Sequence, residues 1–213
     1  MANRFPGYDV LAKRDTLSWN DKTREVIAER LAMSERSDLL SDRQRATLRT
    51  AIDRIVPQPE GRAPVNALAL LLAKIADDGS DGHRHHQLPG LRACYERGLD
   101  AIEEEAKARH GTSFHLLDGS QADLLLSAIE RGDVCSNAWG DLPPAIFWGW
   151  RLLPDIVSSY YAHPSAWSAM GFGGPASPRG YVRIEGDRRD PWEAVEADDG
   201  TLIPAARQNK HVG

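Results

Sequence analysis

The sequence predicts an all-α protein in which a compact helical bundle is followed by a long irregular C-terminal arm. Apolar residues recur at helical spacing in several segments before residue 162, and no segment alternates with period 2 for long enough to predict a sheet. Residues 163–213 are rich in glycine, proline and aromatic residues but show neither periodicity. We therefore expect a bundle at residues 1–162, with residues 1–20 as an extended N-terminal segment, and an arm at residues 163–213.

The first helices are expected at residues 21–33, 41–56 and 64–77. Either Asn20 or Asp21 can cap the first of these helices. Ser41 can open the second helix, and Pro57 stops it because proline cannot continue the helical hydrogen bonding. Pro64 lies in the first turn of the third helix, where the missing N–H of proline has no partner to lose.

The next helices are expected at residues 91–110, 120–132 and 143–160. The first of these has a continuous apolar stripe, and Gly111 follows it at the position where a left-handed residue commonly ends a helix. Ser120 can cap the next helix, and Gly132 can close it. Pro154 removes one backbone donor from the last helix, so we expect a kink or a break near Arg151.

The composition is that of one folded domain with mixed surface charge. The chain has 213 residues, with 26 lysines and arginines against 31 acidic residues, and its net charge of −5 does not favour binding to nucleic acid. No apolar run approaches the ~20 residues that span a bilayer. Residues 1–20 lack the apolar core of a signal peptide. We therefore expect the cytoplasm as the compartment, or the periplasm if the chain is exported together with a signal-bearing partner.

Two cysteines and a run of glutamates are expected to have structural roles. Cys94 and Cys135 are interpreted as buried thiols, while a disulfide between them would require export and closely spaced Cα atoms. Residues 103–105 are all glutamate, and the first and last of them stand four residues before Lys107 and Arg109. We therefore expect a solvated helix face here and not a catalytic carboxylate site.

A histidine-rich loop offers an alternative function. His83, His85 and His86 stand close together in a segment of glycine, aspartate and serine. A metal site needs several ligands that converge from rigid elements, and no cysteine or glutamate is evidently paired with these histidines. A solvated polar loop is the favoured interpretation. The alternative is a stand-alone metal-dependent module that uses this cluster, with His163 as a further ligand.

The most distinctive stretch is residues 160–183, where aromatic side chains need a surface that buries them. The run from His163 to Arg183, together with residues 187–193, resembles the C-terminal signature of the gluconate 2-dehydrogenase subunit 3 family. Shorter stretches upstream also resemble this family, at residues 54–59, at residues 95–99, at Phe114 and at residues 121–125.

The resemblance implies a role in a complex. Members of the family are small accessory subunits of FAD-dependent sugar and sugar-acid dehydrogenases. Their large subunit is a glucose-methanol-choline oxidoreductase that binds the FAD, and a c-type cytochrome accepts the electrons in part of the family. The chain is accordingly expected to support the assembly, stability or maturation of the catalytic subunit of a sugar, sugar-acid or glycoside dehydrogenase, as its partner in a heterodimer. No cofactor and no catalytic residue is expected on this chain.

The arm is expected to dock on the large subunit. Aromatic side chains would anchor it, glycines would permit close backbone approach, and arginines would pair with carboxylates. The expected partner-binding residues are His163, Pro164, Trp167, Gly171, Phe172, Gly173, Gly174, Pro175, Pro178, Arg179, Tyr181, Arg183 and Trp192. Two alternatives stay open: the arm covers the chain's own bundle, or the chain is a chaperone that releases the dehydrogenase after cofactor loading.

Overall fold

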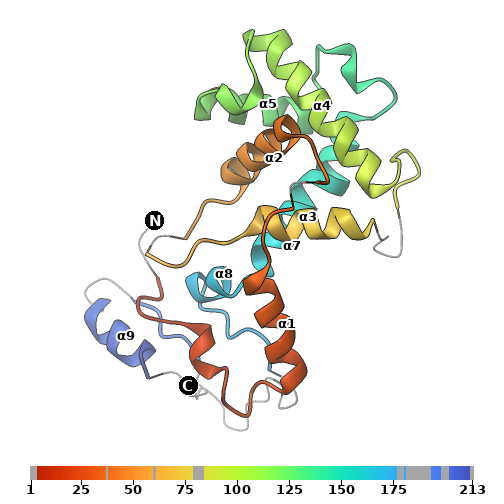
Figure 1. The fold of residues 1–213 in the computed structure, drawn as a ribbon. Coiled ribbons are helices and arrows are strands. Elements are labelled where there is room, and N and C mark those ends of the chain that lie inside the picture. The colour runs from red at the N-terminus through yellow and green to blue at the C-terminus, as the bar shows by residue number, and fades with distance from the viewer. Residues whose placement is uncertain are drawn as a thin grey trace. The chain divides into compact units, whose positions relative to one another are not determined.

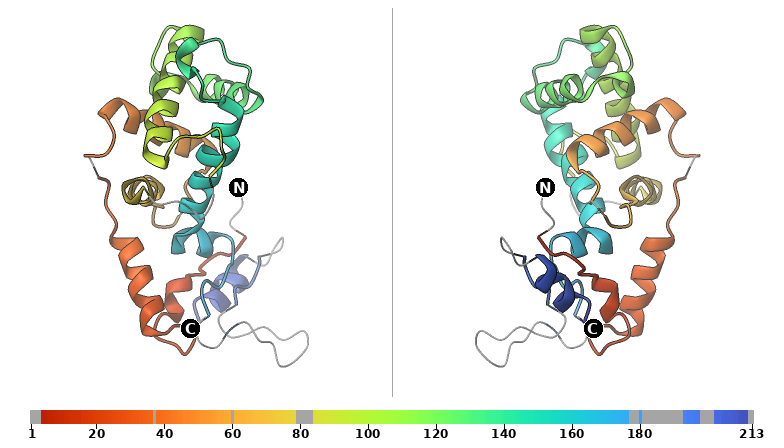
Figure 2. Two further views of the ribbon diagram at one scale, coloured as in Figure 1. Left: turned by 90° about the vertical axis from the view of Figure 1, so that its right-hand side faces the viewer. Right: turned by 90° about the vertical axis from the view of Figure 1, so that its left-hand side faces the viewer.

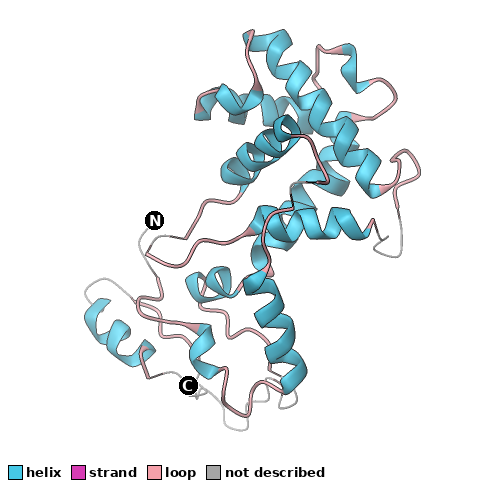
Figure 3. Ribbon diagram, in the orientation of Figure 1, coloured by secondary structure: helices cyan, strands magenta, loops and turns pink. Residues whose placement is uncertain are grey.

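The computed structural model describes residues 4–36, 38–59, 61–78, 84–176, 180, 193–197 and 202–211. Within these residues the regular structure is helical and no β-strand occurs (Figures 1 and 3). The prediction of an all-α fold is therefore confirmed. None of the helices in this part of the chain is long and apolar enough to cross a bilayer.

The chain divides into two compact units. The central unit comprises residues 34–57 and 67–159, and the terminal unit comprises residues 1–33, 58–66 and 160–213. This division differs from the expected boundary at residue 162, because the N-terminal residues group with the arm and not with the bundle. The grouping depends on contacts between residues far apart in the sequence, which helical periodicity does not report.

The central unit is built from the helices that the sequence pattern predicts, but α3 begins only at Ala67, so Pro64 precedes the helix and does not lie in its first turn. Its elements are α2 (Asp42–Ile55), α3 (Ala67–Asp77), α4 (Leu91–His110), η2 (Phe114–Leu116), α5 (Gly119–Arg131), η3 (Asn137–Trp139), α6 (Pro144–Phe147), the π-helix η4 (Trp148–Leu152) and α7 (Leu153–Tyr161), whose end belongs to the terminal unit. Helix α2 packs on α3, α4 and α5, and α6 packs on both α4 and α5. Helices that follow one another in the sequence therefore enclose one core.

Two capping boxes explain where α2 and α5 begin. The Ser41 side chain accepts the N–H of Gln44, and the Gln44 side chain accepts the N–H of Ser41. Asp118 and Gln121 form the same arrangement at the start of α5. The cap of α5 is therefore Asp118 and not the expected Ser120.

Helix α4 carries the core of the central unit. Its apolar stripe is fully buried at Tyr95 and Leu99, and it ends at Gly111, whose φ of 71° is left-handed as the sequence predicts. A Cβ atom on Gly98 would collide with the ring of Phe147, so only glycine lets α6 approach α4 this closely.

The last long helical stretch is irregular where a distortion is expected. Residues Trp148–Leu152 form a π-helix immediately before α7. Pro154 has no N–H to donate to the carbonyl of Trp150, so the regular α-helical ladder cannot run through this point. The kink or break expected near Arg151 is therefore found as a π-helical distortion that leads directly into α7.

The glutamates of α4 correct one expectation. Glu103 and Glu105 are completely buried, so only Glu104 of residues 103–105 is accessible to solvent and the three do not form a solvated face. Glu105 accepts hydrogen bonds from the backbone N–H groups of Cys135 at 2.9 Å and Ser136 at 2.8 Å, and from Arg109. The carboxylate therefore fastens the loop after α5 to α4, because a buried charge needs such partners.

The prediction that both cysteines are buried holds for only one of them. Cys94 is buried and Cys135 is exposed, and both are free thiols. The alternative of a disulfide between them is therefore excluded in this structure.

The terminal unit brings together the two ends of the chain. Its elements are η1 (Val10–Lys13), α1 (Asp21–Ala32), α8 (Pro164–Ala169) and α9 (Leu202–Asn209). Element η1 packs on α8. Figure 2 shows α9, at the blue end of the colour scale, beside the red N-terminal segment. Asn209 accounts for this arrangement, because its side-chain amide donates to the carbonyls of Pro6 and Val195, both at 2.9 Å.

Helices α8 and α9 correct the expectation that residues 163–213 are irregular. Helix α8 has His163 as its N-cap residue and Pro164 in its first turn, and both are suited to a helix start. The two helices contain only six and eight residues. Neither is long enough to display the repeating apolar pattern by which a helix is identified from sequence.

Candidate partner-binding surface

The expected partner-binding residues begin at the start of α8. His163 is 3% exposed, and its Nδ1 atom accepts the N–H of Ser165 at 3.1 Å. Burial lowers the pKa of His163 below its ordinary value, which favours the neutral ring that can accept this hydrogen bond. Pro164 is also buried and occupies the first helical position. Both residues shape α8 from within and present little surface.

Trp167 lies inside the terminal unit and not on its surface. Its side chain is 5% exposed, and its indole N–H donates to the carbonyl of Tyr161. The buried cluster around it consists of Tyr8, Val10, Trp19, Ile27 and Ala194. Trp167 is expected from the sequence to anchor the arm on a partner, but in the isolated chain its ring supplies the core of its own unit.

The glycines after α8 allow the N-terminal segment of the same chain to pack closely against them. Gly171 has a φ of 70°, and a Cβ atom there would lie 2.5 Å from the ring of Phe5. Gly174 has a φ of 64°, and its Cβ position would lie 3.1 Å from the side chain of Val10. Gly173 between them is half-buried. The close approach that the sequence predicts does occur, but the approaching groups belong to the same chain.

Three large apolar side chains close to Trp167 in the sequence are exposed. Tyr161 is 46% exposed, Met170 51% and Phe172 44%. The ring of Phe172 stands edge-on to the ring of Trp167, with the centroids 6.1 Å apart. We call Tyr161, Met170 and Phe172 the Trp167 patch. Contiguous exposed apolar surface is typical of a protein–protein contact, so these three side chains are the candidate contact.

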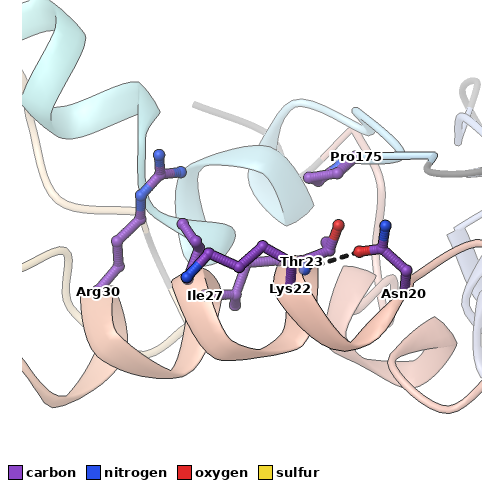
Figure 4. Close-up of a pocket in the computed structure, with 7 residues that line it drawn as sticks. Asn20, Lys22, Thr23, Ile27, Arg30 and Pro175 are labelled. Atoms are coloured by element: carbon purple, nitrogen blue, oxygen red, sulfur yellow. Dashed lines mark hydrogen bonds between the residues drawn. The ribbon is translucent and has the colours of Figure 1, made fainter.

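A groove runs along α1 (Figure 4). It has a volume of about 280 Å³ and is lined by Asn20, Lys22, Thr23, Val26, Ile27, Arg30 and Pro175. Figure 4 shows Pro175 facing α1 across the groove, with Arg30 toward one end and Asn20 toward the other. Pro175, an expected partner-binding residue, therefore lines a cavity at the surface of the terminal unit.

The remaining expected partner-binding residues lie outside the described residues. They are Pro178, Arg179, Tyr181, Arg183 and Trp192. Their expected roles, as aromatic anchors and as partners of carboxylates, stay predictions.

The histidine loop shows no metal site within the described part of the chain. His85 and His86 stack with ring centroids 4.7 Å apart, and the Nδ1 atom of His85 accepts the N–H of Gln87 at 3.3 Å. No three histidine, cysteine or acidic residues among those described are grouped to hold a metal ion. His83 lies outside the described residues, so the metal hypothesis stays a prediction that metal analysis of the purified chain can test.

A comparison with protein families decides how the chain is related to known proteins. The model of the family described as gluconate 2-dehydrogenase subunit 3 matches residues 42–174, which is more than half of the chain. The chain belongs to this family. Comparisons with curated proteins and with solved structures found no match. The resemblance noted in the sequence is therefore confirmed, and the family is that of an accessory subunit of a dehydrogenase complex.

The gluconate 2-dehydrogenase subunit 3 match extends over only part of the terminal unit. It ends at Gly174, so α8 and the whole Trp167 patch lie within the matched residues. Helix α1, helix α9 and Pro175 lie outside them. The N-terminal segment that packs against Gly171 also lies outside the match.

The residues that hold the terminal unit together could not be predicted from the sequence. Val10 donates its backbone N–H to the Oγ atom of Ser168 at 3.0 Å, across a separation of 158 residues. Ala197 donates its N–H to the carbonyl of Arg4 at 2.7 Å. No local pattern connects positions so far apart. The only signal available was the apolar character of Val10 and Tyr8 in a segment without helical periodicity.

A buried polar network in the central unit could not be predicted from the sequence either. The Tyr95 hydroxyl donates to Asp155 at 2.9 Å, and the Nζ atom of Lys74 lies 2.9 Å from the same carboxylate. Burial and the charge of Asp155 raise the pKa of Tyr95 well above its ordinary value, so the hydroxyl stays a donor. The network joins α3, α4 and α7, and we interpret it as structural.

Proposed function

We propose that the chain is the non-catalytic small subunit of a heteromeric FAD-dependent dehydrogenase of the glucose-methanol-choline type. The catalytic partner would bind the FAD and oxidise a sugar, a sugar acid or a glycoside. The role of this chain would be the assembly, stability or maturation of that partner. Family membership supports the proposal, and the observation that carries it is the exposed Trp167 patch within the matched residues.

The Trp167 patch favours a protein partner on energetic grounds. A half-exposed side chain of this size presents on the order of 100 Å² of area, and burying apolar area contributes about 25 cal/mol per Å². Burial of all three side chains would therefore contribute about 7 kcal/mol before the costs of association. The patch would form one part of a docking surface, since a standard interface buries about 800 Å² on each partner.

Production of the catalytic subunit with and without this chain tests the proposal. The subunit would be a glucose-methanol-choline flavoprotein encoded beside it, and the readouts are FAD content, dye-linked oxidation of sugars, sugar acids and glycosides, and thermal stability. We expect a stoichiometric complex and a higher yield of FAD-loaded enzyme when the chain is present. A flavoprotein that loads FAD, oxidises its substrate and resists heat equally well alone, and forms no complex, would contradict the proposal.

Size-exclusion chromatography of the active enzyme distinguishes a subunit from a chaperone. A subunit stays in the active complex, whereas a chaperone leaves after the FAD is loaded. Haem absorbance in the same fractions reports whether a c-type cytochrome belongs to the complex. Cell fractionation tests the compartment, because we expect the chain alone in the cytoplasm and its export only with a signal-bearing partner.

A further inference from the structure

The groove along α1 combines an apolar floor with positive charge. Ile27 is buried, Val26 is half-buried, and Pro175 forms the opposite wall. The two ionic side chains of the lining, Lys22 and Arg30, are both cationic. No carboxylate belongs to the described lining, so the groove is complementary to a ligand that is partly apolar and negatively charged.

Arg30 is available to bind an anion. Its guanidinium is partly buried, and one nitrogen donates to the carbonyl of Ala162 at 3.2 Å. Among the described residues no aspartate or glutamate forms an ion pair with it, whereas Arg24 on the same helix is paired with Asp21. A guanidinium recognises a carboxylate through two parallel hydrogen bonds, and such a bond is stronger where water is partly excluded.

Lys22 adds a second positive charge, and only an exposed ion pair fixes the position of its side chain. Its Nζ atom lies 2.8 Å from the carboxylate of Glu25, and both side chains are largely exposed. An exposed ion pair contributes at most about 1 kcal/mol, so an incoming carboxylate can exchange with Glu25 at little cost. Lys22 therefore attracts an acidic group without fixing its position.

We propose that this groove binds an extended segment of the catalytic subunit that carries an acidic side chain beside an apolar one. The acidic side chain pairs with Arg30, and the apolar side chain packs on Val26 and Ile27 opposite Pro175. Pro175 follows Phe172 closely in the chain, so one partner can occupy the Trp167 patch and the groove together. The inference rests on the proposed function, which supplies the catalytic subunit as that partner.

A carboxylate placed inside the groove tests the proposal. Val26→Glu puts an acidic side chain four residues before Arg30, in the order that favours an ion pair along a helix. The introduced carboxylate then occupies the site intended for the partner. Ala28→Glu adds the same charge to an exposed position of the same helix outside the groove and is the matched control. The Kd for the catalytic subunit is measured with each full-length chain, and circular dichroism and melting of the free chain check folding.

The expected result is binding that is weaker by about 10-fold or more with Val26→Glu and by less than about 2-fold with Ala28→Glu. Arg30→Gln is an independent second variant and decides the question if Val26→Glu unfolds the terminal unit. It should also weaken binding by about 10-fold and reduce the dependence of Kd on salt, because an ion pair is lost.

Two other outcomes separate failure of the groove from failure of the proposed function. Unchanged Kd values for Val26→Glu and Arg30→Gln, with weaker binding by variants of the Trp167 patch, would overturn the groove and leave the proposed function intact. A wild-type chain that does not bind the flavoprotein at all would overturn both.

Discussion

The central and terminal units are held together in different ways. In the central unit, helices that are close in the sequence pack on one another, and the buried carboxylate of Glu105 fastens a loop to α4. In the terminal unit, hydrogen bonds join distant segments, as between Val10 and Ser168 or between Asn209 and Pro6. The comparison teaches that the stretch most suggestive of partner binding also completes a second core.

The same comparison separates two aromatic residues of one short stretch. Trp167 is buried in the terminal unit, whereas Phe172 beside it is exposed. In the sequence both are aromatic residues of a segment rich in glycine and proline, and they look equivalent. In the structure Trp167 contributes to folding, and Phe172 is available to a partner.

Deletion of all residues after Ala162 should have the largest effect, because it removes α8, α9 and most of the Trp167 patch. We expect the central unit to keep its helices, since its core comes from residues 34–57 and 67–159. The terminal unit should lose its core together with Trp167, and complex formation should be abolished. Circular dichroism and co-purification measure the two effects. A truncated chain that binds the flavoprotein as tightly as the full chain would remove the docking role of the arm.

Trp167→Ala should destabilise the terminal unit by about 3–5 kcal/mol, the usual cost of removing a large buried aromatic side chain. Phe172→Ala should change stability by less than about 1 kcal/mol, because its ring is half-exposed. Hydrogen exchange measures the protection of backbone amides in the two units separately. Protection should fall in residues 4–19 with Trp167→Ala and stay unchanged in residues 94–106. A parallel loss in both segments would show that the two cores are not independent.

Glu105→Gln should destabilise the central unit by about 2–4 kcal/mol, because buried donors lose their charged acceptor. Burial acts to raise the pKa of Glu105, but hydrogen bonds from Arg109 and from the N–H groups of Cys135 and Ser136 outweigh it, and the pKa lies below 4.5. The stability that Glu105 contributes is therefore complete above its unfolded pKa and is lost as the pH falls through the folded value.

Urea unfolding at about pH 7 and about pH 4 measures both effects of Glu105→Gln. The variant should be less stable at the higher pH and should lose less stability on acidification than the wild-type chain. Glu104→Gln is the matched control, because this neighbour is half-exposed and pairs at the surface with Lys107, and it should change stability by less than about 1 kcal/mol. Equal effects of the two substitutions would contradict the role of burial.

His163 should make the terminal unit less stable at mildly acidic pH. Burial lowers its pKa below 6.5, so its stabilising contribution is complete above pH 6.5 and declines as the pH falls through the folded value. A protonated Nδ1 atom cannot accept the N–H of Ser165, so α8 loses a cap worth about 1 kcal/mol. His163→Asn keeps a capping side chain that does not titrate. Melting of this variant should depend less on pH than melting of the wild-type chain, and an identical pH dependence would contradict the assignment.

Local contacts explain which parts of the fold could be predicted from the sequence. Helix α4 was predicted at both ends, because its apolar stripe and Gly111 are signals within the segment itself. The burial of Glu103 and Glu105 was not predicted. Glutamates placed four residues before Lys107 and Arg109 give the same sequence pattern on an exposed helix face and on a buried one. Burial depends on which elements pack against α4, and the segment alone does not contain that information.

The sequence predicts a candidate partner-binding stretch, but it does not distinguish the buried residues of that stretch from the exposed ones. The resemblance to the family lies in the run from His163 to Arg183, and Phe172 within that run was expected to be available to a partner. The burial of Trp167 could not be predicted, because its neighbours Tyr8 and Val10 lie at the other end of the sequence. The cationic groove was missed because α1 and Pro175 are also distant in the chain.

The most direct measurement is the affinity of the catalytic subunit for a chain in which Tyr161, Met170 and Phe172 are all replaced by serine. The matched control replaces Leu17 and Ile203, which are exposed apolar residues of the terminal unit outside the patch. We predict a Kd at least about 100-fold weaker for the patch variant, with helicity and melting temperature unchanged, and a Kd for the control close to that of the wild-type chain. A patch variant that binds as tightly as the wild-type chain would contradict the proposed docking surface.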